Sequence, residues 1–135
     1  MQTWLPLPDF GQSAACLDYK RLGKQRVECK QILNALIGHK QGWKHHPVTK
    51  MWAGHEGMLC VYAIIMTEEW RYRGYEDSML DWFFELGASL PQESFTMPPF
   101  IGDASFHIHH QSRLCWKNPE FYGAYGWCGF RIVLG

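Results

Sequence analysis

The stretch that most constrains the fold of this chain is LDYKRLGKQRVE, residues 17–28. It sets four of the thirteen Lys and Arg residues into a segment with helical periodicity. At about 100° of turn per residue, one stripe of that helix carries Asp18, Arg21, Gln25 and Glu28. Further along, the same stripe becomes apolar, with Ile32, Leu33 and Leu36. A polar stripe that runs into a core stripe predicts carboxylates and cations that face inward or line a cleft. The alternative is a solvated face, since charge runs on helices usually face water.

Size and composition predict one folded domain over residues 1–135. Hydrophobic residues make up 47% and aromatic residues 16% of the chain, which suffices for a core and argues against disorder. The longest apolar run, residues 58–66, is far shorter than the roughly 20 residues that cross a bilayer. The start shows no basic flank followed by an apolar signal segment. We therefore expect no contact with a membrane.

The cysteines predict a reducing, cytoplasmic environment. They are odd in number, widely spaced and without a CxxC pair: Cys16, Cys29, Cys60, Cys115 and Cys128. Neither a disulfide framework nor a zinc ribbon fits that spacing.

Charge is distributed unevenly along the chain, although the net charge is zero. Residues 1–50 carry eight Lys and Arg against three Asp and Glu, whereas residues 51–100 carry two against eight. The remainder carries three against two. A neutral protein with a basic N-terminal third can still present a positive face to phosphates.

The periodicity predicts an all-α fold, a compact single-domain bundle of about four helices with long loops and an extended N-terminal arm. Pro6 and Pro8 favour the arm. The helices are expected over residues 14–37, 48–73, 79–86 and 104–117. The second is apolar nearly all round, which is typical of a central buried helix. Ser13 and Asp103 are suitable N-caps for the first and the last helix. Residues 130–134 could form a short extended piece.

A second polar cluster lies on the last predicted helix. Asp103, His107 and His110 follow at i, i+4 and i+7, and Gln111 follows His107 at i+4, so these side chains share one face. Imidazoles that titrate near neutrality suit an acid–base or phosphate-binding site, with Asp103 orienting His107. The structural alternative is a polar cap network buried beneath the predicted helix over residues 79–86. Two imidazoles and a carboxylate could also bind a metal, but no HExxH-like signature is present, and we expect neither a metal nor a cofactor.

Short blocks spread over about residues 1–125 carry a resemblance to a known family. The blocks are Met1-Gln2-Thr3 with Leu5, Leu17-Asp18, Lys20 to Glu28, Gly42-Trp43 with His46-Pro47, Lys50-Met51-Trp52, Gly54, Glu69-Trp70, Arg73-Gly74, Gly102-Asp103, Phe106-His107, His110-Gln111-Ser112, Leu114, and Lys117 with Pro119-Glu120 and Tyr122. On these residues the chain resembles the pyrimidine-dimer DNA glycosylase superfamily, and more closely a bacterial and phage branch of it.

The resemblance implies a small all-α DNA repair enzyme that removes a base and nicks the strand. In that family the nucleophile is the α-amine exposed when Met1 is removed, and a glutamate of the first long helix assists. The DNA is bent and a nucleotide leaves the stack. Here Gln2 follows Met1, and a bulky second residue protects Met1 from removal. By register through Leu22, Arg21 occupies the glutamate position. The resemblance therefore supports the fold and DNA contact better than the lyase chemistry.

We therefore predict cleavage of an N-glycosidic bond in DNA with damaged or modified bases, without an N-terminal amine. Glu28 or Asp18 would activate water or stabilise the positive sugar, and His107 with His110 would serve as acid–base partners. The expected contacts with nucleic acid are Lys20, Arg21, Lys24, Gln25, Arg26, His46, Lys50, Gln111, Ser112 and Lys117. Trp43 and Trp52 are candidates for stacking on a base, with core packing as the alternative for Trp52.

Two other functions fit the same residues. One is a non-catalytic module that binds DNA or a nucleotide, for example at modified bases. The other is a hydrolase or transferase that acts on small nucleotides in a closed pocket. The expected partner is duplex DNA or a nucleotide, and the sequence predicts no oligomeric state.

Overall fold

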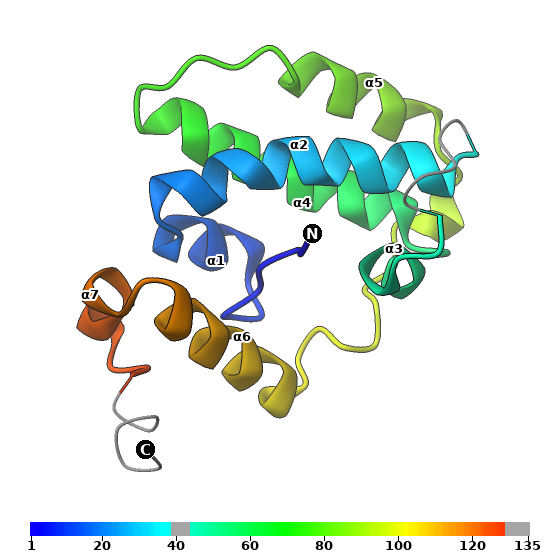
Figure 1. Ribbon diagram of the computed structural model, residues 1–135. Coiled ribbons are helices and arrows are strands. Elements are labelled where there is room, and N and C mark those ends of the chain that lie inside the picture. The colour runs from blue at the N-terminus through cyan, green and yellow to red at the C-terminus, as the bar shows by residue number, and fades with distance from the viewer. Residues whose placement is uncertain (39–43, 129–135) are drawn as a thin grey trace.

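Two long helices that pack side by side, α2 (Tyr19–Leu36) and α4 (Glu56–Tyr72), form the centre of the molecule. The structure is a computed structural model and describes residues 1–38 and 44–128. In Figure 1, α5 (Leu80–Ser89) lies above this pair and α6 (Ala104–Lys117) below it. Within the described ranges the chain forms helices and no strand, so the predicted all-α fold is confirmed.

The first predicted helix is broken into α1 (Phe10–Cys16) and α2, because Leu17 and Asp18 adopt extended backbone angles. Leu17 is fully buried at this corner. The predicted N-cap, Ser13, lies inside α1, where its hydroxyl exchanges two hydrogen bonds with the backbone of Leu7. Asp9 caps α1 instead. The prediction of one continuous helix capped by Ser13 is therefore wrong.

The second predicted helix is also broken, into α3 (Pro47–Met51) and α4. The chain turns at Gly54, whose φ of +85° is a left-handed value that glycine adopts without strain. The expectation of a central buried helix is nevertheless met by α4, because its buried residues include Leu59, Tyr62 and Met66.

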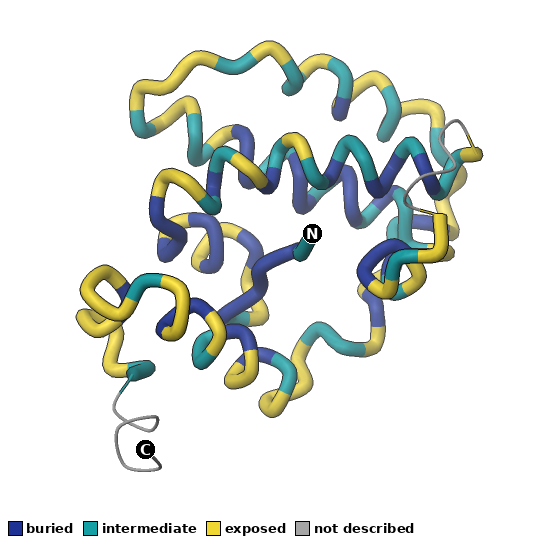
Figure 2. The backbone as a smooth tube through the Cα atoms, in the orientation of Figure 1, coloured by how far each residue is buried: buried dark blue, intermediate teal, exposed yellow. Residues whose placement is uncertain are grey.

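The C-terminal part contains the short helices η1 (Gln92–Ser94), α7 (Pro119–Tyr122) and η2 (Gly123–Tyr125) in addition to α6. Asp103 caps α6 as predicted, since its carboxylate accepts a hydrogen bond from Ser105 N. The expected extended piece at residues 130–134 lies outside the described residues. The described helices share one hydrophobic core (Figure 2), and none of them is long and apolar enough to span a membrane.

A disulfide joins Cys115, near the end of α6, to Cys128. The turn made by α7 and η2 brings the two Cα atoms to 5.5 Å, a normal separation for a disulfide. The expectation of no disulfide is therefore wrong for this pair, because a spacing of thirteen residues becomes a close pair only after the chain folds back. Cys16, Cys29 and Cys60 are free thiols.

The N-terminal arm, residues 1–8, runs between the α2–α4 pair and α6, and much of it is buried (Figure 2). Side chains of the neighbouring helices bind its backbone. Gln25 Oε1 accepts a hydrogen bond from Trp4 N at 2.9 Å, and its Nε2 donates to Gln2 O at 2.9 Å. The Tyr62 hydroxyl donates to Trp4 O at 2.7 Å. These bonds replace the strand ladder that a buried extended segment otherwise needs.

Two buried histidines of α6 hold the arm from the other side. His110 Nδ1 accepts a hydrogen bond from Leu5 N at 2.9 Å. His107 Nε2 accepts from Gly102 N, so its Nδ1 carries the proton and donates to Leu5 O at 2.8 Å. Gln111 Nε2 adds a bond to the carbonyl oxygen of the next arm residue. The two imidazoles are therefore fixed as opposite tautomers around one peptide segment.

The acceptor role of His110 predicts a loss of stability in acid. Burial, followed by the charges of His109, His107 and Arg113, lowers the pKa of His110 to about 4 from its ordinary 6.5. The unfolded chain therefore binds a proton that folded His110 refuses, so this contribution is present above pH 6.5 and is lost as the pH falls towards 4. Urea unfolding should show a loss of about 2 kcal/mol from this group between pH 7 and pH 5.

The matched variants are His110→Asn, which keeps an acceptor near the Nδ1 position, and His109→Asn, which changes an exposed ring. His110→Asn should lose less stability than the wild type between pH 7 and pH 5. His109→Asn should lose nearly as much as the wild type, because it removes one charge that lowers the pKa of His110 but leaves burial, the largest cause. An equal loss in all three proteins would contradict the role of His110.

Candidate functional site

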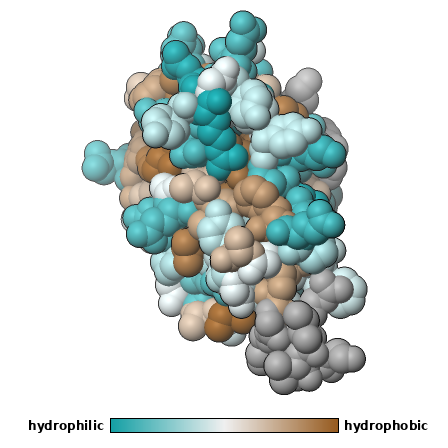
Figure 3. All heavy atoms as spheres, turned by 90° about the vertical axis from the view of Figure 1, so that its left-hand side faces the viewer, coloured by the Kyte–Doolittle hydropathy of each residue, from teal (hydrophilic) through white to brown (hydrophobic). Residues whose placement is uncertain are grey.

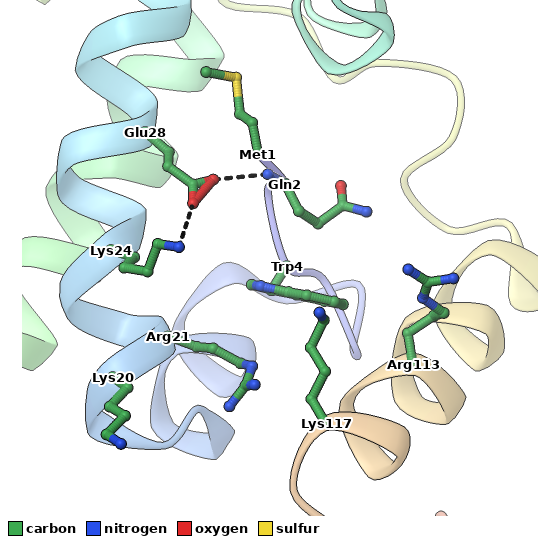
Figure 4. A pocket seen from close by; sticks show the side chains of 9 residues that line it. All are labelled: Met1, Gln2, Trp4, Lys20, Arg21, Lys24, Glu28, Arg113 and Lys117. Carbon is green, nitrogen blue, oxygen red and sulfur yellow. Dashed lines mark hydrogen bonds and ion pairs between the residues drawn. The ribbon is translucent and has the colours of Figure 1, made fainter.

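A polar cavity of about 360 Å³ opens where the arm passes between α2 and α6. Figure 4 shows that α2 and α6 supply its two walls and that the arm crosses between them. The described residues that line it are Met1, Gln2, Trp4, Lys20, Arg21, Lys24, Glu28, Arg113 and Lys117. Five of these side chains are cationic, and one, Glu28, is acidic. The cavity therefore suits an anionic ligand that reacts near a carboxylate.

Glu28 is held at the end of the arm. Its Oε2 accepts a hydrogen bond from Gln2 N at 2.7 Å, and its Oε1 lies 3.9 Å from Lys24 Nζ (Figure 4). The predicted polar stripe of α2 does face inward, because Gln25, one turn earlier, binds the arm as well. The sequence comparison through Leu22 places Arg21 where the resembled family has its glutamate. In the structure, the carboxylate that binds the backbone nitrogen of residue 2 is that of Glu28, which lies further along α2.

Arg21 is oriented by a buried network at the start of α2. Its Nη1 lies 3.2 Å from both carboxylate oxygens of Asp18. The Tyr122 hydroxyl donates to Asp18 Oδ1 and accepts from Asp18 N at 2.9 Å. Burial raises the pKa of Tyr122, which keeps this hydroxyl protonated. Asp18 is thus only 5% exposed and bound to partners on both sides, so it orients a cation instead of presenting a carboxylate to the cavity.

Two hollows adjoin the cavity and share its cations. One, of about 450 Å³, is lined by Asp18, Tyr19, Lys20, Arg21, Lys117, Asn118 and Phe121. The other, of about 330 Å³, is lined by Arg113, Trp116 and Lys117. Together they extend a basic surface with aromatic residues from α2 across the end of α6. Hydrophobic and hydrophilic residues are interspersed on the side of the molecule where α7 lies (Figure 3).

Some residues that line the cavity were not predicted as site residues from the sequence. Arg113 lies one helical turn before Lys117, and that i, i+4 pair of cations was the available signal. Trp4 was missed because nothing in an extended arm shows which side chains face a cavity. Its indole lies between the side chains of α2 and those of α6 (Figure 4).

The two histidines predicted as acid–base partners do not form a wall of the cavity. His107 and His110 are 3% and 2% exposed, and neither lines the cavity. Both rings lie behind the arm, where they bind the backbone of Leu5. Arg113 and Lys117 supply that wall instead. The structural alternative is correct in expecting a buried polar network, but the network lies against the N-terminal arm and not beneath α5.

Other predicted contacts lie away from the cavity. Arg26 forms an ion pair with Asp77, and its guanidinium lies 4.5 Å from the ring centroid of Trp70. The charge of Arg26 therefore interacts with other side chains of the protein and not with the cavity. Trp52 is fully buried and donates to the Thr3 hydroxyl, which excludes stacking on a base in this conformation. Gln25, Gln111, His46, Lys50 and Ser112 do not line the cavity either. Trp43 lies outside the described residues.

Lys20, Arg21, Lys24 and Lys117 are the predicted phosphate contacts that the fold gathers around Glu28. Residues 1–82 match the family model described as pyrimidine dimer DNA glycosylase. The chain belongs to the pyrimidine dimer DNA glycosylase family. Searches of the curated proteins and of the solved structures find no match.

Membership in this family carries a DNA glycosylase-like function and DNA binding at the level of the family. The matched segment contains the arm, α2 and Glu28, whereas Arg113 and Lys117 lie beyond it. Extension of the family's domain to residue 135 and assignment to a bacterial and phage branch stay predictions.

The network around Asp18 predicts a specific loss of stability in Tyr122→Phe. The variant keeps the ring but leaves the buried Asp18 N–H without its acceptor, and it removes one of the donors to the Asp18 carboxylate, which keeps Arg21. An unsatisfied buried group of this kind costs about 1–3 kcal/mol of unfolding free energy. Urea unfolding measures this loss, with Tyr72→Phe as the control because Tyr72 is 87% exposed. Equal stability of the two variants would contradict the role assigned to Tyr122.

Proposed function

We propose that this protein hydrolyses the N-glycosidic bond of a damaged or modified base in duplex DNA, with Glu28 as the catalytic carboxylate. The observation that carries the proposal is the position of Glu28. It is the one acidic side chain among the described residues lining a cavity with five cations. The glycosylase function of the family supports the same chemistry.

The reaction needs a carboxylate close to the sugar and cations close to the phosphates. As the bond from C1′ to the base nitrogen breaks, its electron pair leaves with the base, which takes up a proton from solvent. Positive charge develops at C1′, and the Glu28 carboxylate stabilises it. Water adds to C1′ and gives its proton to Glu28. Arg21 and Lys117, from opposite walls, bind the flanking phosphates.

Base release proceeds in this proposal without a Schiff base. The nitrogen that binds Glu28 is the Gln2 amide, which is preceded by Met1 and has no nucleophilic lone pair. A bulky Gln2 protects Met1 from removal. The expected product is therefore an abasic site in an intact strand.

Glu28→Gln is the direct test. The amide retains the size of the side chain but cannot stabilise positive charge or accept the proton of water, so base release should fall by about 10²- to 10⁴-fold. Release is measured on duplexes with single damaged or modified bases, and strand nicking and borohydride trapping are measured in parallel. Glu68→Gln, an exposed position on α4, is the matched control and should retain activity.

Equal release by wild type and Glu28→Gln would overturn the catalytic role of Glu28. A borohydride-trapped complex with the wild type would overturn the absence of a Schiff base, and mass spectrometry of the N terminus would then identify the reacting amine. No release from any duplex, with salt-dependent binding that survives Glu28→Gln, would indicate a non-catalytic DNA-binding module.

A further inference from the structure

The last turn of α6 presents an exposed aromatic ring beside two cations of the cavity. Trp116 is 63% exposed, whereas its neighbours Leu114 and Cys115 are fully buried. The hollow of about 330 Å³ next to the cavity is lined by Arg113, Trp116 and Lys117. Arg113 and Lys117 also line the cavity that contains Glu28. The indole therefore lies beside the cavity, on the side of α6.

An exposed indole flanked by cations has the chemistry that binds unstacked nucleobases. Every base has a π-face that can stack on an aromatic ring, and neighbouring Lys and Arg side chains bind the strand's phosphates. Bases within a paired duplex stack on each other and leave no face for the ring. A ring at this position therefore distinguishes an unpaired nucleotide from a paired one.

We propose that Trp116 stacks on an unpaired base of the DNA strand that leaves the Glu28 cavity, with Arg113 and Lys117 binding the adjoining phosphates. This subsite adds affinity for single-stranded or locally opened DNA that a continuous duplex does not gain. The inference rests on the proposed function only in taking DNA as the ligand. It does not depend on which base is released or on catalysis by Glu28.

The charges of the molecule favour DNA over a protein as the occupant. Another exposed aromatic ring, Tyr72 on α4, is 87% exposed and lines a hollow with Glu68 and Glu69. The described residues that line this hollow include two carboxylates and no cation, whereas two cations line the hollow of Trp116 and attract a polyanion. Tyr72 therefore serves as a control, an exposed aromatic residue beside a hollow without a cation among its described lining residues, although Arg71 and Arg73 flank it in the chain.

The test measures binding of an undamaged 12-nucleotide strand, alone and annealed to its complement as a blunt-ended duplex, by fluorescence anisotropy at several salt concentrations. Trp116→Ala should raise the Kd for the single strand about 5- to 100-fold, the range expected for one stacked base, and change the duplex Kd less than twofold. Trp116→Phe should recover most of the loss, and Tyr72→Ala should match the wild type. Lys117→Ala should weaken both ligands and reduce the dependence on salt.

Unchanged single-strand binding by Trp116→Ala would overturn the proposal and would favour a protein as the partner that contacts the Trp116 ring. Equal weakening of the single strand and the duplex would also overturn it, because the ring would then act without discriminating unpaired bases. Since undamaged DNA is bound and not cleaved, either result is independent of the outcome with Glu28→Gln.

Discussion

The buried backbone of the N-terminal arm is the constraint on which the rest of this structure depends. An extended segment in a helical protein has no neighbouring strand, and each of its buried peptide groups still needs a partner. Gln25, Tyr62, His107 and His110 supply these partners from three different helices. Polar residues that resemble a catalytic cluster in the sequence are thus required by the arm.

Fixing the arm also creates the site. Because Gln25 and Glu28 lie one turn apart on α2, the bonds that position Trp4 also bring Gln2 N to the Glu28 carboxylate. The arm separates α2 from α6 far enough to leave a cavity, and both helices turn cations towards it. The position of the arm therefore determines how α2 and α6 pack, how the buried backbone of the arm is paired, and what surrounds the Glu28 carboxylate.

The parts of the site that depend on helical periodicity were predictable from the sequence, whereas the parts that depend on long-range contacts were not. The stripe from Asp18 to Glu28 follows from 100° per residue, and it faces inward as expected. The role of His110 depends on Leu5, more than one hundred residues away, which no local pattern reveals. The pairing of Cys115 with Cys128 likewise depends on the turn made by α7.

The central claim is that the arm and Glu28 together form the position where a sugar reacts. A crystal structure with duplex DNA containing a tetrahydrofuran abasic-site analogue tests it most directly. We expect the C1′ atom to contact the Glu28 carboxylate, the arm to keep its position, and Arg21 and Lys117 to bind the flanking phosphates. DNA bound across another face, with Glu28 remote from the sugar, would contradict it.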